Sequence, residues 1–498
     1  MQLRGSTRWL CFCAASVLVL AARLAVNAQA PGLKLVDRVV VTNKIFALVQ
    51  QHFAHWEATT PTEMESAYRQ YVSDTLQADT RQAFDRASLR FVARLRNGHT
   101  QFFDNQAAGR PLKFRLLEVE GQWVVIASRQ ARLARGTVVR AIGGQPIEDF
   151  VREAAQYVHA SNDRLARTHV FSYPVLFPEK VSLDLADGGT VVVDRSAPDE
   201  TPVAAPARES EGRWLSGQEV AYIRVPSFGD AAYEKTAIDL VRQYANAPTL
   251  VVDVRGNGGG TTPQQLIAAL MNRPWRMWQE VIPQPGGSGS QAVSPTSTVR
   301  ESRPQAPSPD AYAGRMYLLI DRFCGSACED FVMPFKDTGR AVVVGETTQG
   351  SSGNPYRADI GHGISVAIGA RRYRFPDGTA FEGVGIAPDV PVERRVSDLV
   401  AGRDAVLERA QRLAAHPRGQ PLQPRCPSQE PATRRVLMAS RFSLGLRPSS
   451  HRPPRAHLDQ LPFAAINRAR IVVPCSLVNR GTSEMRPCQC ARMIPDGE

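Results

Sequence analysis

The sequence predicts an α/β fold that follows a helical region and a β-rich region. Two short apolar runs, Thr249–Val254 and Met316–Asp321, have the length and composition of buried strands. Each is followed by a turn and then by a segment with helical periodicity. Alternation of this kind implies parallel strands with helices packed outside the sheet.

Residues 33–105 are interpreted as an N-terminal helical cap. Apolar side chains recur there at the spacing of amphipathic helices in three stretches, Asp37–Gln51, Thr62–Leu76 and Ala83–Leu95.

Residues 111–203 are expected to form a β-rich module. Apolar and polar residues alternate there between glycines, as in Trp123–Ile126 and Thr137–Ile142, which is typical of short strands. A helix is expected near Ile147–Val158. Whether the module has a peptide-binding groove or is only a β-rich lid is left open.

Residues 210–400 are predicted to form the α/β core. Its further expected elements are a strand at Val220–Val225, helices at Ala231–Tyr244, Pro263–Met271 and Ser326–Asp337, and a strand at Ala341–Val344. The stretch Gln284–Pro309 is rich in Pro, Gly, Ser and Gln, and we expect an exposed flexible loop there.

The two ends of the chain differ from the rest. Residues 1–28 are typical of a secretory signal peptide, because a short basic start precedes an apolar stretch and small residues. We therefore expect a periplasmic or secreted protein, with an uncleaved membrane anchor as the alternative. Residues 412–498 are rich in Arg and Pro without a sustained period, and disorder is expected there.

The charge of the chain does not predict a nucleic-acid partner. The formal net charge is +12, but residues 416–498 contain 13 Arg and only 5 acidic residues, so the body of the protein is nearly neutral. Only six of the 60 basic residues are lysines. No cysteine spacing matches a zinc site, and neither a metal nor a cofactor is expected.

A glycine-rich turn, Asp253–Gly260, follows one of the predicted strands. Adjacent glycines let backbone N–H groups approach a ligand, so the turn can hold an oxyanion or a phosphate. It matches neither the dinucleotide fingerprint nor a Walker loop. A plain strand–helix turn remains the alternative.

A serine stands at a second strand–helix junction, in Asp321–Glu329. Ser326 at a helix start is either a cap or an exposed nucleophile. Cys324 and Cys328 flank it, and they are either small buried thiols or a disulfide. His99, in Asn97–Thr100, becomes a general base only if the fold brings it to Ser326.

These segments together resemble tail-specific, carboxyl-terminal processing serine peptidases. The resemblance covers about Leu33 to Arg395 and is carried by four ordered motifs, Asp253–Gly260, Gly325–Glu329, Gly339–Thr348 and Pro376–Asp389. It implies a crotonase-like ββα core, often with a helical N-terminal part and a PDZ-like module. The module at 111–203 is similar to such a PDZ-like unit.

The resemblance implies that Ser326 is the nucleophile. The best-known branch uses a lysine base 25 residues later, where this chain has Ser351. A second branch, which includes the tricorn core protease, uses a histidine in a Gly-His-Thr-like motif and a glutamate, matched here by His99 and Glu382. The tricorn core protease has a serine beside the histidine, where this chain has Gly98. The supporting contact is either missing here or supplied by another residue, with Ser351 and Ser352 as candidates.

The predicted function is that of an exported serine endopeptidase without metal or cofactor, acting on polypeptide substrates. Backbone N–H groups of Ala327 and of Gly258 or Gly259 are the predicted oxyanion donors. Two alternatives remain: a non-catalytic binding protein on the same fold, and an esterase with the same serine. The sequence predicts no nucleic-acid partner and no membrane span after signal cleavage, and it does not indicate the oligomeric state.

Overall fold

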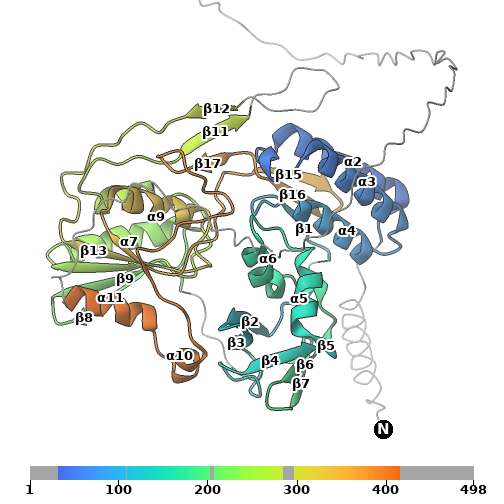
Figure 1. Cartoon of the computed structure of the whole chain (residues 1–498), viewed down its shortest axis with the longest axis horizontal. Coiled ribbons are helices and arrows are strands. Elements are labelled where there is room, and N and C mark those ends of the chain that lie inside the picture. The colour runs from blue at the N-terminus through green and yellow to red at the C-terminus, as the bar shows by residue number, and fades with distance from the viewer. Residues whose placement is uncertain (1–31, 108, 202–206, 284–296, 416–498) are drawn as a thin grey trace, which may run out of the picture. The chain divides into compact units, whose positions relative to one another are not determined.

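The computed structural model of the protein describes residues 32–107, 109–201, 207–283 and 297–415 (Figure 1). All of them belong to one structural unit, Met1–Cys426. The predicted signal peptide and the chain beyond residue 415 lie outside the described residues. Within the described ranges, no helix combines the length and the apolar character needed to cross a membrane.

A six-stranded sheet forms the centre of the α/β core. Its neighbours run parallel except at one edge, where β8 is antiparallel to β9. In spatial order the strands are β18 (Val390–Pro391), β14 (Val342–Gly345), β13 (Arg315–Ile320), β10 (Thr249–Asp253), β9 (Val220–Arg224) and β8 (Glu211–Ser216). The predicted parallel pairing is confirmed. The strand β8 was not predicted, because its mostly exposed residues carry no apolar alternation.

Helices cover both faces of this sheet, as Figure 1 shows. Successive strand side chains point to opposite faces. Leu250 therefore packs with the helices α7, α8 and α9, whereas Val251 packs with α11. The bounds are α7 (Ala231–Gln243), α8 (Gln264–Leu270), α9 (Ala327–Thr338), α10 (Val396–Ala401) and α11 (Ala405–Ala415).

The N-terminal helices are close to their predicted positions. They are α2 (Leu35–His52), η1 (Trp56–Ala58), α3 (Pro61–Gln77) and α4 (Arg81–Arg94). Threonine side chains cap two of them: Thr60 accepts the N–H of Glu63, and Thr80 accepts the N–H of Ala83. Tyr71 and Phe91 stack in the core between the helices, with ring centroids 4.7 Å apart.

A small sheet completes this helical region with residues from far along the chain. Strand β1 (Gln101–Asp104) pairs with β16 (Ile364–Ile368), which pairs with β15 (Tyr356–Gly361). Ile364 and Ile368 pack into the same apolar cluster as the helices. The segment between α4 and β1 carries His99, and it is therefore held by a packed helix before it and a paired strand after it.

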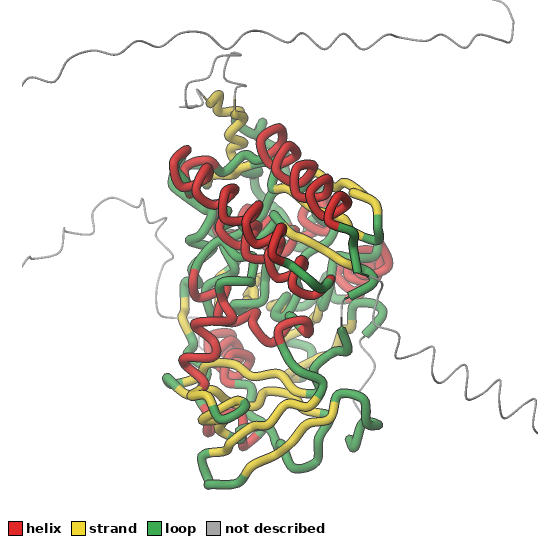
Figure 2. The backbone as a smooth tube through the Cα atoms, turned by 90° about the vertical axis from the view of Figure 1, so that its right-hand side faces the viewer, coloured by secondary structure: helices red, strands yellow, loops and turns green. Residues whose placement is uncertain are grey.

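The β-rich region has a second antiparallel sheet, drawn in yellow in Figure 2, with helical segments packed on it. Its order is β2-β3-β4-β6-β7, and β5 also pairs with β4. The bounds are β2 (Phe114–Val119), β3 (Gln122–Ser128), β4 (Val138–Ile142), β5 (Gln145–Pro146), α5 (Ile147–Ala155), α6 (Asp163–His169), η2 (Val170–Ser172), η3 (Pro174–Leu176), β6 (Lys180–Leu185) and β7 (Thr190–Asp194).

The prediction of a loop across Gln284–Pro309 is wrong for residues 297–300, whereas residues 301–309 form a mostly exposed loop as predicted. Residues 284–296 lie outside the description, but β12 (Ser297–Arg300) pairs with β11 (Gln279–Pro283), which also pairs with β17 (Arg372–Arg374). A four-residue edge strand is stabilised by its partner rather than by its own composition, so the polar sequence gave no signal.

Candidate active site

The carboxyl ends of parallel strands bring the predicted site segments to one edge of the central sheet. The glycine turn follows β10, and the serine turn follows β13, its direct neighbour in the sheet. Ligand sites of open α/β sheets lie at this edge. The segment after α4 reaches the same place, where Nε2 of His99 lies 3.0 Å from Oγ of Ser326.

Ser326 adopts a backbone conformation that is rare for a residue with a side chain. Its φ is 55° and its ψ is −125°, immediately before α9. The backbone around it is fixed, because its N–H donates to the carbonyl of Ser351 (2.9 Å) and its own carbonyl accepts from Glu329 (2.7 Å). Such strained turns recur at functional sites and present a hydroxyl above a sheet edge.

His99 is half-buried in a turn that Asn97 shapes. The Oδ1 atom of Asn97 accepts the N–H of His99 (3.1 Å) and the hydroxyl of Thr100 (3.0 Å). Burial, with a smaller contribution from Arg357, lowers the pKa of His99 to about 4. At neutral pH the imidazole is therefore uncharged and able to accept a proton.

The hydroxyl of Ser351 bridges His99 to Glu382. Its Oγ lies 2.9 Å from Nδ1 of His99 and donates to Oε1 of Glu382 at 3.2 Å. A Cβ atom at Gly98 would lie only 2.7 Å from this Oγ. The glycine beside the histidine thus leaves room for the hydroxyl of Ser351, which is one of the two residues anticipated from the sequence to supply this contact.

Glu382 receives three hydrogen bonds on one carboxyl oxygen. Oε1 accepts from Oγ of Ser161 (2.5 Å), Nδ2 of Asn97 (2.8 Å) and Oγ of Ser351 (3.2 Å). Burial raises the pKa of Glu382 to about 7, although these hydrogen bonds oppose the rise. The sequence analysis named neither Ser161 nor Asn97 as a partner of Glu382.

Of the two glycine N–H groups predicted as alternative oxyanion donors, only that of Gly258 lacks an acceptor among the described residues. The N–H of Gly259 donates to Oδ1 of Asn257 (2.9 Å), so the prediction that Gly259 supplies an oxyanion donor is corrected. Among the described residues, the N–H groups of Gly258 and Ala327 have no acceptor. A Cβ atom at Gly258 would also meet nothing within 4 Å, so this side of the turn is open.

Gly259 has a steric function instead. A Cβ atom there would lie 2.7 Å from Cβ of Ser326, 2.8 Å from the carbonyl oxygen of Gly325 and 2.9 Å from the nitrogen of Ala327. Its φ of 102° also suits only glycine. The serine turn packs directly on the glycine turn, and no other residue type fits between them.

Glu329 ties the serine turn to the Ser351 loop. Its carboxyl group accepts from the hydroxyl of Thr348 (2.5 Å) and from the N–H groups of Gly350 (2.7 Å) and Ser351 (3.0 Å). The N–H of Ser326 also donates to it at 3.2 Å. One buried side chain therefore fixes the relative position of two of the site's segments.

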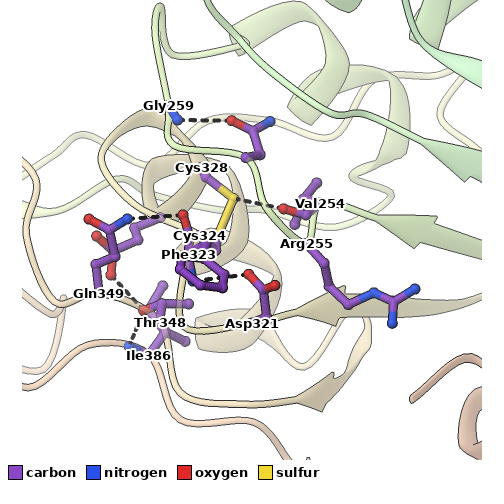
Figure 3. Close-up of a disulfide and its surroundings, with 12 residues drawn as sticks. Val254, Arg255, Gly259, Asp321, Phe323, Cys324, Cys328, Thr348, Gln349 and Ile386 are labelled. Atoms are coloured by element: carbon purple, nitrogen blue, oxygen red, sulfur yellow. Dashed lines mark hydrogen bonds between the residues drawn. A yellow bond between two sulfur atoms is a disulfide. The ribbon is translucent and has the colours of Figure 1, made fainter. Parts of the chain in front are cut away.

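Cys324 and Cys328 form a disulfide across the serine turn (Figure 3). Both residues are fully buried, and Sγ of Cys328 lies 3.6 Å from the carbonyl oxygen of Val254. Of the two interpretations considered above, bonded cysteines are correct. The disulfide joins the turn after β13 to the first turn of α9, and Ser326 lies between the two cysteines in the sequence.

Comparison with known proteins shows what this chain is similar to. Residues 219–392 match the model of Peptidase family S41. Tricorn protease homolog 1 of Streptomyces coelicolor is 29% identical over 215 residues, which are 40% of this chain and 17% of that protein. The carboxyl-terminal-processing protease of Synechocystis is 27% identical over 222 residues, 43% of this chain and 48% of that protein.

Over residues 219–392 the chain is therefore similar to Peptidase family S41. The chain spans less than half the length of these two curated relatives. The crystal structure of mature CPAF superposes with a TM-score of 0.63 at 12% identity and covers 76% of this chain and 98% of its own. At that identity the likeness concerns the mixed α/β fold alone.

Replacing Gly259 by alanine should disrupt the turn that holds Ser326. The new Cβ would push the serine turn away and separate Oγ of Ser326 from Nε2 of His99, so the rate at which a fluorophosphonate labels the protein should fall by about 10²- to 10⁴-fold, as for loss of acid–base assistance. Gly339→Ala is the matched control, since Gly339 also has a positive φ of 62° but faces open space. Equal labelling of G259A and wild type would contradict the steric argument.

Proposed function

We propose that the protein is a serine endopeptidase in which Ser326 is the nucleophile, His99 the general base and Glu382 the supporting acid. The observation that carries the proposal is the 3.0 Å separation of Nε2 of His99 from Oγ of Ser326, within the range for a base and a nucleophile.

The direction of the hydrogen bonds favours the correct tautomer of His99. The single proton of the Ser351 hydroxyl is donated to Glu382, so this hydroxyl can only accept from Nδ1 of His99. Nδ1 then carries the imidazole proton, and Nε2 presents its lone pair to Ser326. An ionised Glu382 strengthens this chain and stabilises the imidazolium that forms during the reaction.

The reaction then proceeds in two halves. Oγ of Ser326 attacks the peptide carbonyl carbon while its proton passes to Nε2 of His99, and the carbonyl oxygen becomes an oxyanion near the N–H groups of Gly258 and Ala327. The imidazolium returns the proton to the leaving amine as the C–N bond breaks, leaving an acyl-enzyme. A water molecule, deprotonated by His99, releases the acid and restores Ser326.

A lysine base does not suit this site. The position 25 residues after Ser326, where the best-known branch has its lysine, is Ser351, whose hydroxyl contacts His99 instead. The nearest lysine along the helix is Lys336, which is ion-paired with Asp389. These contacts favour the histidine-using branch that includes the tricorn core protease.

We also propose the finer architecture that the sequence suggested. Residues 33–105 would be a helical cap, 111–203 a PDZ-like module and 210–400 a crotonase-like catalytic core. The prediction of a disordered tail over 412–498 is wrong for residues 412–415, which end α11 and bury Ala414 against the central sheet; the rest of that tail lies outside the described residues. Export to the periplasm or the exterior, after cleavage near Ala28, is supported by the Cys324–Cys328 disulfide, because disulfides persist in oxidising compartments.

A fluorophosphonate probe tests the nucleophile directly. We expect it to label the wild-type protein and not Ser326→Ala, and we expect His99→Ala to lose labelling at neutral pH, since a serine hydroxyl needs an adjacent base. Label on S326A equal to wild type would refute the assignment. Competition between peptide and small-ester substrates separates a peptidase from an esterase, and activity retained in S326A would favour a binding protein.

The pH dependence follows from the two perturbed groups, which titrate together. Glu382 must be ionised to support His99, so kcat/KM should rise with pH through about 7, the pKa to which burial raises this carboxyl. In Glu382→Gln the acid limb near pH 7 should disappear from the profile of kcat/KM. The acid limb that remains should lie near pH 4, because the pKa of His99 is lowered to about 4.

In Glu382→Gln the plateau value of kcat/KM should also fall by about 10²- to 10⁴-fold, as for loss of acid–base assistance. Rate measurements between pH 4 and 9 check both expectations. An acid limb in E382Q that stays where the wild type has it would contradict the role given to Glu382.

A further inference from the structure

The segment between α5 and α6 reaches into the site from the β-rich region. Oγ of Ser161 donates to Oε1 of Glu382 at 2.5 Å, the shortest hydrogen bond to that oxygen, and accepts the N–H of Gly98 at 2.9 Å. Ser161 is buried. One hydroxyl thus contacts both the carboxyl group and the turn that carries His99.

The side chains of residues after Ser161 bind backbone carbonyl groups of the α/β core, and we call the segment 161–164 the clasp. Nδ2 of Asn162 donates to the carbonyls of Gln349 (3.1 Å) and Gly383 (3.0 Å). The guanidinium of Arg164 donates to the carbonyl of Thr348 at 2.6 Å. These acceptors lie beside Glu382 and just before Ser351, so the position of the clasp and the position of the site residues are coupled.

We propose that Ser161 is a positioning residue through which the β-rich region sets the protonation state of Glu382, and with it proton transfer at His99. This inference rests on the proposed function. A displacement of the segment 161–164 would withdraw the hydroxyl from Glu382 without touching Ser326. The β-rich region is then part of the proton-transfer system rather than only a lid or a substrate-binding unit.

The balance of forces at Glu382 explains why one hydroxyl matters. A buried carboxylate is unfavourable unless donors satisfy it. Oε2 of Glu382 is buried without a hydrogen-bond partner, so the charge depends on the three donors at Oε1 and on the nearby backbone N–H of Ser352, which also lowers the pKa of this carboxyl. Loss of the donor from Ser161 removes the shortest of them, and the carboxyl should keep its proton to higher pH.

The other titratable groups near this carboxyl leave that direction unchanged. His99 faces Glu382 through Ser351, and the carboxyl of Glu329 interacts with it electrostatically. Arg357, His55 and His159 act on the imidazole side. None of these five groups hydrogen-bonds to Ser161, so its replacement does not remove a contact of theirs.

A structural role alone would give a different result. If Ser161 only holds the N–H of Gly98, its loss would misplace His99 and lower the rate at every pH by the same factor. If it acts on Glu382, the rate would fall at low pH and recover at high pH, where the carboxyl ionises even without the hydroxyl. The position of the acid limb therefore separates the two roles.

The test compares pH profiles of kcat/KM, or of fluorophosphonate labelling, for the full chain. Ser161→Ala should move the acid limb upward by about one pH unit, the shift expected for one lost hydrogen bond to a charged group. That is a loss of about tenfold one pH unit below the wild-type midpoint, with a nearly unchanged rate at pH 9. Ser161→Thr, which keeps the hydroxyl, should restore the wild-type limb.

Ser196→Ala is the matched control. Ser196 lies in the same β-rich region and donates to Asp194 at 2.6 Å, but that pair is exposed and far along the chain from the site residues. We expect no shift from it. If S161A does not fold, as judged by thermal unfolding, Ser161→Cys keeps the size with a weaker donor and should give a smaller shift in the same direction.

An acid limb in S161A or S161C at the wild-type position would overturn the inference, whether or not the rate falls. Ser326→Ala is included in the same series. If S326A is labelled like wild type, the proposed function fails. If S326A is unlabelled and the limb of S161A is unmoved, the function stands and only the role of Ser161 fails.

Discussion

The hydrogen-bond chain from His99 through Ser351 to Glu382 is the constraint on which the site depends. Each link needs a group from a different part of the chain, and each is 2.9–3.2 Å long. Three donors surround Oε1 of the half-buried Glu382, and they favour the ionised form of its carboxyl. Gly98 contributes by lacking a side chain, since a larger residue would occupy the place of the Ser351 hydroxyl.

The two turns at the sheet edge supply the other half of the site. Parallel strands β10 and β13 end side by side, so the turns that follow them meet without any long connection. Gly259 lets them touch, and the Cys324–Cys328 cross-link restrains the turn that carries Ser326. The strained backbone of Ser326 is tolerated in this setting, because the segments on both sides of it are fixed.

Much of this was predictable because the signals are local. The periods of the helices and the apolar strands gave the elements of the α/β core, and the motif order gave Ser326, His99 and Glu382. Hydrogen bonds between distant residues have no local signal, so Ser161 was missed, and Ser351 was one of two options. The N–H of Gly259 was predicted as an oxyanion donor for the same reason, because nothing in the sequence indicates that it donates to the side chain of Asn257.

The order of the site residues along the chain has a consequence for biosynthesis. Asn97 and Glu382 are 285 residues apart, and β1 finds its partner β16 only when residue 368 has been made. Synthesis at about 5–20 residues per second therefore separates the emergence of Asn97 from that of Glu382 by roughly 15–60 s. The site cannot be assembled before residue 382 has been made, so the order of its residues along the chain sets the earliest time at which a nascent chain can form it.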